Sequence, residues 1–128
     1  MPDALLDTTV FIDYYRGHQG AIDTIDRIVA SNIRCYYSPV SVFELWLRDM
    51  RRDEEMGFVS LLNLFEEATF DRRAAHLTAA WLKNFSRARR LALAADAMIA
   101  ATAASRDATI YTRNVRDFRR LYANVESY

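Results

Sequence analysis

Two carboxylates interrupt apolar helical patterns in the sequence. Glu44 falls on the same predicted helical face as Phe43 and Leu47, because residues three and four apart lie on one side of a helix. Asp96 shares a predicted face with Ile99 and a row of alanines. A carboxylate that is buried without a partner is costly. Each of the two is therefore either half of a buried ion pair or part of a site that holds a proton or a cation.

Asp7 adds a third acidic group. It ends a short apolar run, and taken alone it is an ordinary N-cap candidate for the helix that follows. Clustered with Glu44 and Asp96 it has a second interpretation, because like charges a few Å apart raise one another's pKa and a hard divalent cation relieves the repulsion. Oxygen donors select Mg²⁺ or Mn²⁺ over zinc. We therefore predict Asp7, Glu44 and Asp96 as ligands of Mg²⁺ or Mn²⁺.

The segment YTRNVRDF, residues 111–118, places more polar groups directly after a predicted strand. Thr112, Asn114 and Asp117 supply oxygen atoms there. Asn114 is equally an N-cap for a short helix, and Asp117 is equally a solvated helix residue. Because ligands bind beyond the carboxyl ends of parallel strands, we expect this segment and Asp7 to share one edge of a sheet.

Alternating strand and helix patterns predict the elements that must position these groups. The predicted fold class is α/β, with three layers (α/β/α) and a short, mostly parallel sheet of four or five strands. Three glycines and two prolines in 128 residues favour long helices with short connections. Strands are predicted at residues 4–7, 33–37, 68–70, 108–111 and 123–126, and helices at residues 9–16, 20–31, 39–51, 54–67, 72–89, 93–106 and 115–121.

Composition favours a single domain over residues 1–128. Hydrophobic residues make up 52% of the chain, which permits a large core. No apolar run reaches the roughly 18 residues of a membrane span, and no signal peptide is evident, so we expect a cytoplasmic protein without membrane contact. Cys35 lies in an apolar run and is predicted to be a core residue. His18 and His76 lack zinc-ligand spacing and are predicted to be surface or packing residues.

Arginine dominates the basic residues, with sixteen Arg and one Lys. Its planar fork suits phosphate groups, although GC-rich coding or a hot environment produces the same bias. Five arginines are predicted substrate contacts through the phosphate backbone: Arg48, Arg51 and Arg52, which follow Glu44, and Arg113 and Arg116, which flank Asn114. The alternative is that they form solvated faces or pair with neighbouring carboxylates.

In order and spacing, these segments resemble PIN-domain nucleases, and specifically the VapC-type toxins of prokaryotic toxin–antitoxin pairs. The matching strings are LLDTTVFID at the N-terminus, SPVSVFEL around Glu44, LALAADAMIAATA around Asp96 and IYTRNVRDF near the C-terminus. The resemblance implies a Rossmann-like sheet with its acidic residues at one rim, and it implies that Asp7, Glu44 and Asp96 bind the metal.

Two further site assignments follow from the resemblance. The fourth acidic position is often Asp, but here it is Asn114, and Asp117 lies one helical turn farther on. This departure puts a second metal in doubt more than the first. Thr8 or Thr9 matches the hydroxyl that follows the first Asp and orients a ligand or phosphate.

The implied activity is that of an Mg²⁺- or Mn²⁺-dependent endoribonuclease that hydrolyses RNA phosphodiester bonds without a covalent protein nucleophile. The implied partners are a cognate antitoxin, which inserts near the acidic site, and a second copy of the chain. One alternative is a degenerate PIN-like domain that binds RNA or a partner without cutting. Another is a phosphotransfer domain with Asp7 as nucleophile, although the expected DxD string is absent. Six apolar residues are candidates for either a docking groove or, as we favour, the core: Trp46, Phe58, Leu61, Leu62, Leu64 and Phe65.

Overall fold

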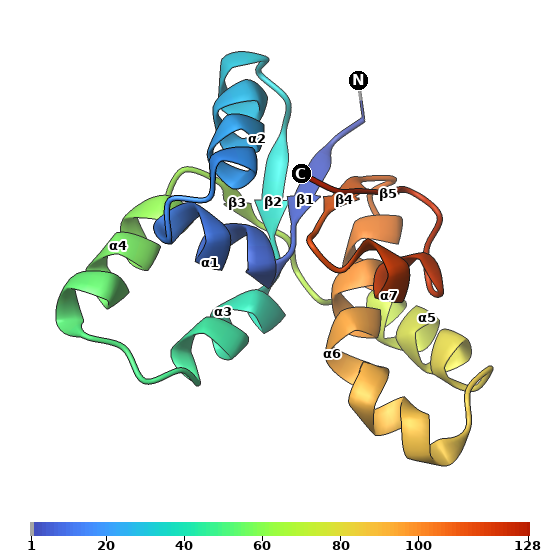
Figure 1. The fold of residues 1–128 in the computed structure, drawn as a ribbon. Helices are drawn as coiled ribbons and strands as arrows, with labels where there is room; N and C mark the ends of the chain where they lie inside the picture. Colours follow the sequence, from blue (N-terminus) through green and yellow to red (C-terminus); the bar gives the residue numbers. More distant parts are fainter. Residues whose placement is uncertain (1) are drawn as a thin grey trace.

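Five short strands form one sheet in the computed structural model, which describes residues 2–128 (Figure 1). The strands are β1 (Ala4–Leu6), β2 (Cys35–Tyr37), β3 (Glu66–Glu67), β4 (Thr109–Tyr111) and β5 (Val125–Glu126). Their order across the sheet is β3-β2-β1-β4-β5, and each neighbouring pair is parallel. The predicted α/β class is therefore confirmed, with a fully parallel five-stranded sheet.

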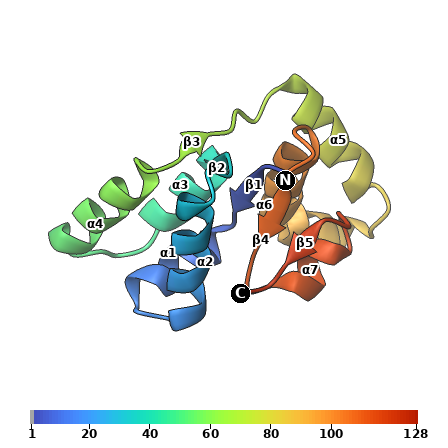
Figure 2. The ribbon, with the colours of Figure 1, turned by 90° about the horizontal axis from the view of Figure 1, so that it is seen from above.

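Helices cover both faces of this sheet. Figures 1 and 2 show α1 to α4 on one side and α5 to α7 on the other, which confirms the three-layer arrangement. Residues 2–128 contain no helix long and apolar enough to cross a membrane. The helices are α1 (Thr8–Tyr15), α2 (Gln19–Ala30), α3 (Pro39–Trp46), α4 (Arg52–Leu62), α5 (Arg72–Leu82), α6 (Arg87–Ala104) and α7 (Val115–Arg119).

The central strand β1 shows why the sheet has two cores. Successive strand residues point to opposite faces, so Ala4 and Leu6 pack with α1 to α4 while Leu5 packs with α6 and α7. Leu5 and Leu6 have no exposed surface, and burying each contributes roughly 2 kcal/mol. A strand buried on both faces has a continuous apolar run rather than an alternating one, which is the pattern at the N-terminus of this chain.

Several predicted element bounds were wrong, and local contacts explain the differences. The predicted helix 39–51 ends at Trp46, and α4 starts at Arg52, where three acidic residues in its first turn suit the positive helix end. The predicted helix 72–89 ends at Leu82. There the Arg90 guanidinium donates to the carbonyls of Leu82 and Phe85, each at 3.1 Å, and satisfies groups that a helix end leaves unpaired.

The third strand lies at Glu66–Glu67 rather than at residues 68–70. It pairs with β2, Glu66 opposite Tyr36 and Glu67 opposite Tyr37. Both glutamates are exposed at the sheet edge, where charged side chains discourage pairing with another chain. An edge strand of this kind carries no apolar pattern, which is why the sequence did not reveal it.

Candidate active site

Asp7 is a buried carboxylate at the carboxyl end of β1. Only 3% of its surface is exposed. The hydroxyls of Thr112 and Thr9 donate to its Oδ2 at 2.9 and 3.0 Å. Burial raises the pKa of Asp7, and these two hydrogen bonds oppose the shift. Asp7 occupies the N-cap position of α1, but its side chain makes no capping hydrogen bond, so the capping interpretation accounts for the position and not for the carboxylate.

Glu44 reaches the same place from α3. The Thr8 hydroxyl donates to Glu44 Oε1 at 2.6 Å, and the hydroxyl oxygen of buried Ser41 lies 2.8 Å from that of Thr8. A threonine has a single hydroxyl proton, so the Ser41 hydroxyl supplies the proton between the two oxygens. The pKa of Glu44 is raised by burial and, more weakly, by the charge of Asp7. Thr8 therefore fixes a half-buried carboxylate beside Asp7.

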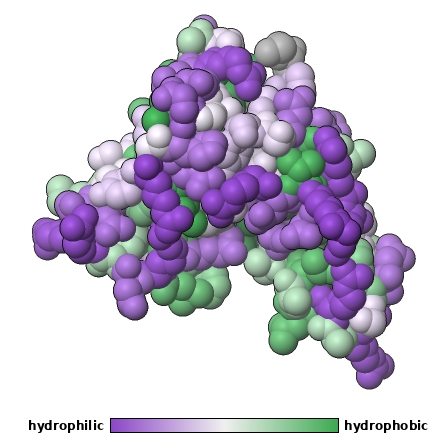
Figure 3. All heavy atoms as spheres, in the orientation of Figure 1, coloured by the Kyte–Doolittle hydropathy of each residue, from purple (hydrophilic) through white to green (hydrophobic). Residues whose placement is uncertain are grey.

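Asp96 on α6 completes the group electrostatically. Burial raises its pKa to about 7, and the charges of Asp7, Glu44 and Asp117 contribute to the rise in that order. Four carboxylates from β1, α3, α6 and α7 thus influence one another at one rim. α3 and α6 are in contact, and Figure 3 shows the surface hollowed between the lower ends of these helices.

Asp117 and Asn114, the two candidates for the fourth acidic position, lie in different surroundings. Asn114 is exposed, and its side chain makes no capping hydrogen bond at the start of α7. Its contribution is a backbone N–H, which donates to the Thr112 hydroxyl at 2.9 Å. Asp117 is half-buried and its charge acts on Asp96. Asn114 therefore helps to orient Thr112, and Asp117 supplies the charge.

A second network, which the sequence did not indicate, fixes Arg113 at this rim. The Arg113 Nη1 lies 2.8 Å from Asp13 Oδ1, and the Tyr128 hydroxyl donates to Asp13 Oδ2 at 2.5 Å. The backbone N–H of Arg113 also donates to the Thr9 hydroxyl at 3.1 Å, and Thr9 holds Asp7. Asp13 was detectable as a carboxylate one turn after Thr9 on an apolar helix, whereas nothing in the sequence pointed to Tyr128 or to Ser41.

The remaining predicted arginines lie elsewhere. Arg116 is exposed on α7. Arg48 lines a separate pocket between α1, α3 and α4. Arg51, which follows it, pairs with Asp53 and Glu54 at 3.4 and 3.3 Å, as the alternative to phosphate contact anticipated. Of the five predicted phosphate contacts, Arg113 is the one tied by hydrogen bonds to the acidic group, through Thr9 and Asp7.

The predicted apolar face around Glu44 is not buried. Phe43 and Leu47 are 63% and 68% exposed. The prediction that Glu44 interrupts a buried helical face was therefore wrong, although Glu44 does lie beside Asp7 as expected. The face of α6 is buried at Ile99 and at most of its neighbours, although Ala92 is exposed. Of the six groove-or-core candidates, Phe58, Leu61 and Leu62 are buried, Phe65 is half-buried, and Trp46 and Leu64 are exposed.

The donor set suits a hard cation, although the side chains do not converge. Across residues 2–128, no three His, Cys, Asp or Glu side chains are grouped closely enough to form a metal site. The four rim carboxylates are nevertheless within electrostatic range, because the charges of the other three raise the pKa of Asp96. Oxygen-only donors that repel one another are the chemistry that Mg²⁺ or Mn²⁺ satisfies. His18 caps α2 by accepting from the Ala21 N–H, and it is no part of this group.

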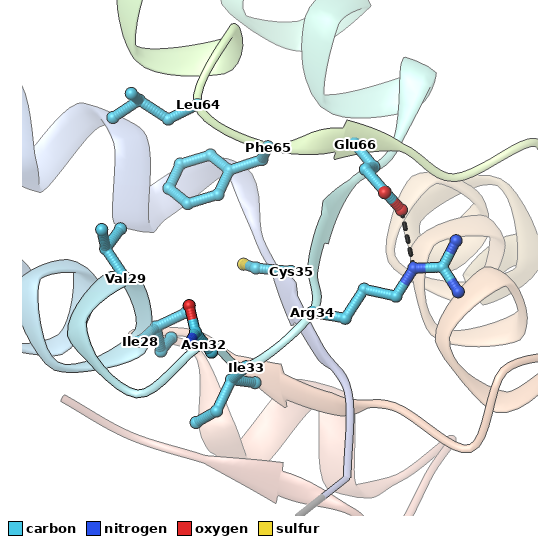
Figure 4. A pocket seen from close by; sticks show the side chains of 9 residues that line it. All are labelled: Ile28, Val29, Asn32, Ile33, Arg34, Cys35, Leu64, Phe65 and Glu66. Atoms are coloured by element: carbon cyan, nitrogen blue, oxygen red, sulfur yellow. Dashed lines mark hydrogen bonds and ion pairs between the residues drawn. The ribbon is translucent and has the colours of Figure 1, made fainter.

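A pocket of about 260 Å³ lies away from these carboxylates, at the edge formed by β2 and β3 (Figure 4). The Arg34–Glu66 ion pair, at 2.8 Å, crosses its rim. The Cys35 sulfur points into the space between Val29 and Phe65. Burial raises the pKa of Cys35 to about 12, so the thiol is a poor nucleophile, and its predicted place in the core is confirmed.

Comparison with known proteins places this site in a family. The family model of the PIN domain matches residues 4–124, so the chain belongs to the PIN domain family. PIN domains are generally nucleases. No curated protein matches the sequence.

Solved structures share the fold. VapBC2 from Rickettsia felis, bound to a DNA fragment from its promoter, matches with a TM-score of 0.78 at 16% identity, covering 98% of each chain. DNA-bound VapBC from Salmonella typhimurium matches with a TM-score of 0.78 at 21% identity, covering 99% of this chain and 98% of the other. A toxin–antitoxin complex from Klebsiella pneumoniae matches with a TM-score of 0.76 at 22% identity, covering 97% and 96%.

Proposed function

We propose that this protein is a metal-dependent endoribonuclease and the toxin of a toxin–antitoxin pair. One observation carries the activity. Carboxylates from four separate elements lie within electrostatic range at the carboxyl rim of a parallel sheet, where burial and mutual repulsion raise the pKa of Asp96 to about 7. A carboxylate whose pKa is strongly shifted by burial and by specific neighbouring charges is a candidate for a functional site. Membership of the PIN family supports hydrolysis of a nucleic-acid phosphodiester as the reaction.

Asp7, Glu44 and Asp96 would hold Mg²⁺ or Mn²⁺, with Asp117 as the fourth acidic group. When bound, such a cation lowers the pKa of water and polarises a phosphate oxygen. The chain itself orients the Asp7 carboxylate, because the hydroxyls of Thr9 and Thr112 both donate to its Oδ2 and hold it at the rim.

Thr8 and Arg113 have distinct roles beside these carboxylates. Thr8 holds Glu44 in place through its 2.6 Å hydrogen bond. Arg113, with its side chain 53% exposed and anchored on Asp13, would contact a phosphate of the bound strand. Glu44 would hold the cation directly or through a water, or would orient the attacking water, since its carboxylate is half-buried and fixed beside Asp7.

RNA as the substrate, an antitoxin as the partner and a homodimer as the assembly are part of the same proposal. Two of the structural neighbours described above are VapBC proteins, and the one from Klebsiella pneumoniae is a toxin–antitoxin complex. Exposed apolar side chains offer contact surface for a protein partner: Phe43, Trp46 and Leu47 on or just beyond α3, Met56 and Val59 on α4, and Leu64. A partner of this kind and an RNA substrate are consistent with a cytoplasmic toxin.

The test is cleavage of RNA with Mg²⁺, with Mn²⁺ and with EDTA, comparing the wild type with Asp96→Asn. We expect cleavage that requires the metal and falls at least about 100-fold in the variant. The matched control is Asp26→Asn, which changes an exposed carboxylate on α2 and should cleave like the wild type. Cleavage that persists in EDTA or in Asp96→Asn would overturn the proposal. RNA binding by a wild type that never cleaves would instead identify a degenerate PIN-like domain, for which the exposed Asn114 is the sequence sign.

A further inference from the structure

We infer that a second pocket, at the opposite end of α1 from Thr8, is a subsite for a backbone phosphate of single-stranded RNA. It lies between the C-terminal end of α1, the α3–α4 connection and α4, and has a volume of about 250 Å³. In Figure 1 the α3–α4 connection passes below α1, so these three elements frame one region. The inference rests on the proposed function, because it assigns part of the same substrate.

The charge of this pocket is positive. Three arginines line it, Arg16, Arg48 and Arg51, against the single carboxylate of Glu54. Arg51 is the one already engaged, with Asp53 and Glu54 at 3.4 and 3.3 Å. Arg51 and Asp53 are both exposed, and an ion pair between such side chains is weak. With Asp53 and Glu54 both counted, the three arginines leave an excess of one positive charge, which favours an anionic ligand.

Arg48 has a hydrogen-bond donor that the described residues leave unsatisfied. Its Nη1 is enclosed, yet it has no hydrogen-bond acceptor anywhere in residues 2–128. An enclosed N–H without an acceptor is costly, and a guanidinium satisfies its donors best with paired oxygens such as those of a phosphate. The orphaned donor therefore favours a rotation of the Arg48 guanidinium toward a ligand that brings oxygen atoms into the pocket.

The position of the pocket identifies that ligand as part of a nucleic-acid strand. Arg48 lies four residues beyond Glu44, just past the end of α3. The helix α1 connects the same two places, because Thr8 at its start contacts Glu44 and Arg16 caps its end. Phosphates repeat along a strand, so a strand with one phosphate at the acidic rim extends others toward the arginines. Positive charge there offsets the repulsion between the rim carboxylates and the backbone.

An aromatic side chain in the pocket favours RNA over an acidic protein segment. Tyr15 lines the pocket and is 39% exposed, while its ring packs against Phe58 with centroids 5.1 Å apart. Sites for single strands combine basic groups with aromatic rings on which bases stack. A site for a protein carboxylate has no need of the exposed ring.

The test measures the affinity of a short fluorescent single-stranded RNA by anisotropy. The protein carries Asp96→Asn to suppress cleavage, and Arg48→Gln or Arg16→Gln is added. We expect Kd to rise about tenfold for Arg48→Gln and less for Arg16→Gln. The slope of log K against log salt should become shallower by about 0.7 for each phosphate that the variant no longer neutralises. Arg16 is exposed, so its variant tests the pocket even if Arg48→Gln does not fold. The control is Arg73→Gln, an exposed arginine on α5 in the opposite layer.

The outcomes separate the subsite from the proposed function. If both pocket variants bind RNA with the Kd and the salt slope of the Arg73→Gln control, the subsite is overturned, whether or not the wild type cleaves. If the pocket variants weaken RNA binding while the wild type fails to cleave, the subsite stands and the nuclease assignment fails. The same variants are also tested for binding of a hexaglutamate peptide. If they lose affinity for the peptide while their affinity for RNA is unchanged, the inference is overturned in favour of a protein carboxylate as the ligand.

Discussion

The two helices that carry Glu44 and Asp96 hold their carboxylates in different ways. α6 has 18 residues and buries seven of them, so Asp96 is positioned by the packing of its helix. α3 has eight residues and buries only Ser41 and Leu45, so Glu44 is positioned by one hydrogen bond from Thr8. One side of the site is therefore built by the core, and the other is held by polar contacts beneath an exposed apolar surface. The difference predicts which substitutions affect stability and which affect the site alone.

The largest effect is expected from truncating the α6 side. Ile99 has no exposed surface and packs in the core of that layer, so Ile99→Ala should lower the free energy of unfolding by about 2–5 kcal/mol. Chemical denaturation monitored by circular dichroism measures it. The matched control is Leu47→Ala just beyond α3, where the side chain is 68% exposed and the change should stay within about 0.5 kcal/mol. Equal losses at the two positions would contradict the contrast between the helices.

A smaller effect is expected from pH in the absence of metal. The pKa of Asp96 in the fold is about 7, above its usual 3.8, and those of Asp7 and Glu44 are also raised. The folded state therefore favours the protonated acids, so their stabilisation is complete below about pH 4 and is lost as pH rises through about 7. The melting temperature in EDTA should be lower at about pH 8 than at about pH 5.

Two comparisons sharpen the pH prediction. Saturating Mn²⁺ at the higher pH should raise the melting temperature, because a ligand that binds only the folded state stabilises it. Asp96→Asn should flatten the pH dependence in EDTA and reduce the Mn²⁺ shift, whereas Asp26→Asn should leave both unchanged. If the melting temperature in EDTA were instead higher at about pH 8 than at about pH 5, the rim carboxylates would not be mutually destabilising.

The contrast between α6 and α3 also separates what the sequence predicted correctly from what it did not. The α6 pattern is long enough for its periodicity to place Asp96 correctly at a buried face, and the buried strands indicated the fold class. On α3, periodicity predicted a buried face that is in fact exposed at Phe43 and Leu47, because this short helix at the rim buries only Ser41 and Leu45. Residues such as Ser41 and Tyr128 enter the networks through contacts far along the chain. Local sequence patterns carry no information about such contacts.

A modest effect on activity is expected from the polar anchor on the α3 side. Thr8→Val keeps the shape of the side chain but removes the donor to Glu44. A hydrogen bond to a charged group is worth about 1.5–3 kcal/mol, so kcat should fall about tenfold or more while the affinity for RNA changes little. Thr8→Ser, which restores a hydroxyl, should recover most of the activity. A Thr8→Val enzyme with full activity would show that Glu44 needs no such anchor.

The smallest effect on the stability of the single chain is expected at the exposed apolar surface of α3. The same substitution tests whether this surface contacts another molecule. Phe43 is 63% exposed, so Phe43→Ser should change the free energy of unfolding by no more than about 0.5 kcal/mol. If this surface contacts a second copy of the chain, the same substitution should shift the mass measured by light scattering toward the monomer. A matched change on α6, Leu91→Ser at a residue 86% exposed, tests whether the lower end of that helix belongs to the same contact. A mass shift with Phe43→Ser alone would limit the contact to α3, whereas no shift with either would mean that α3 presents its apolar residues to a different partner.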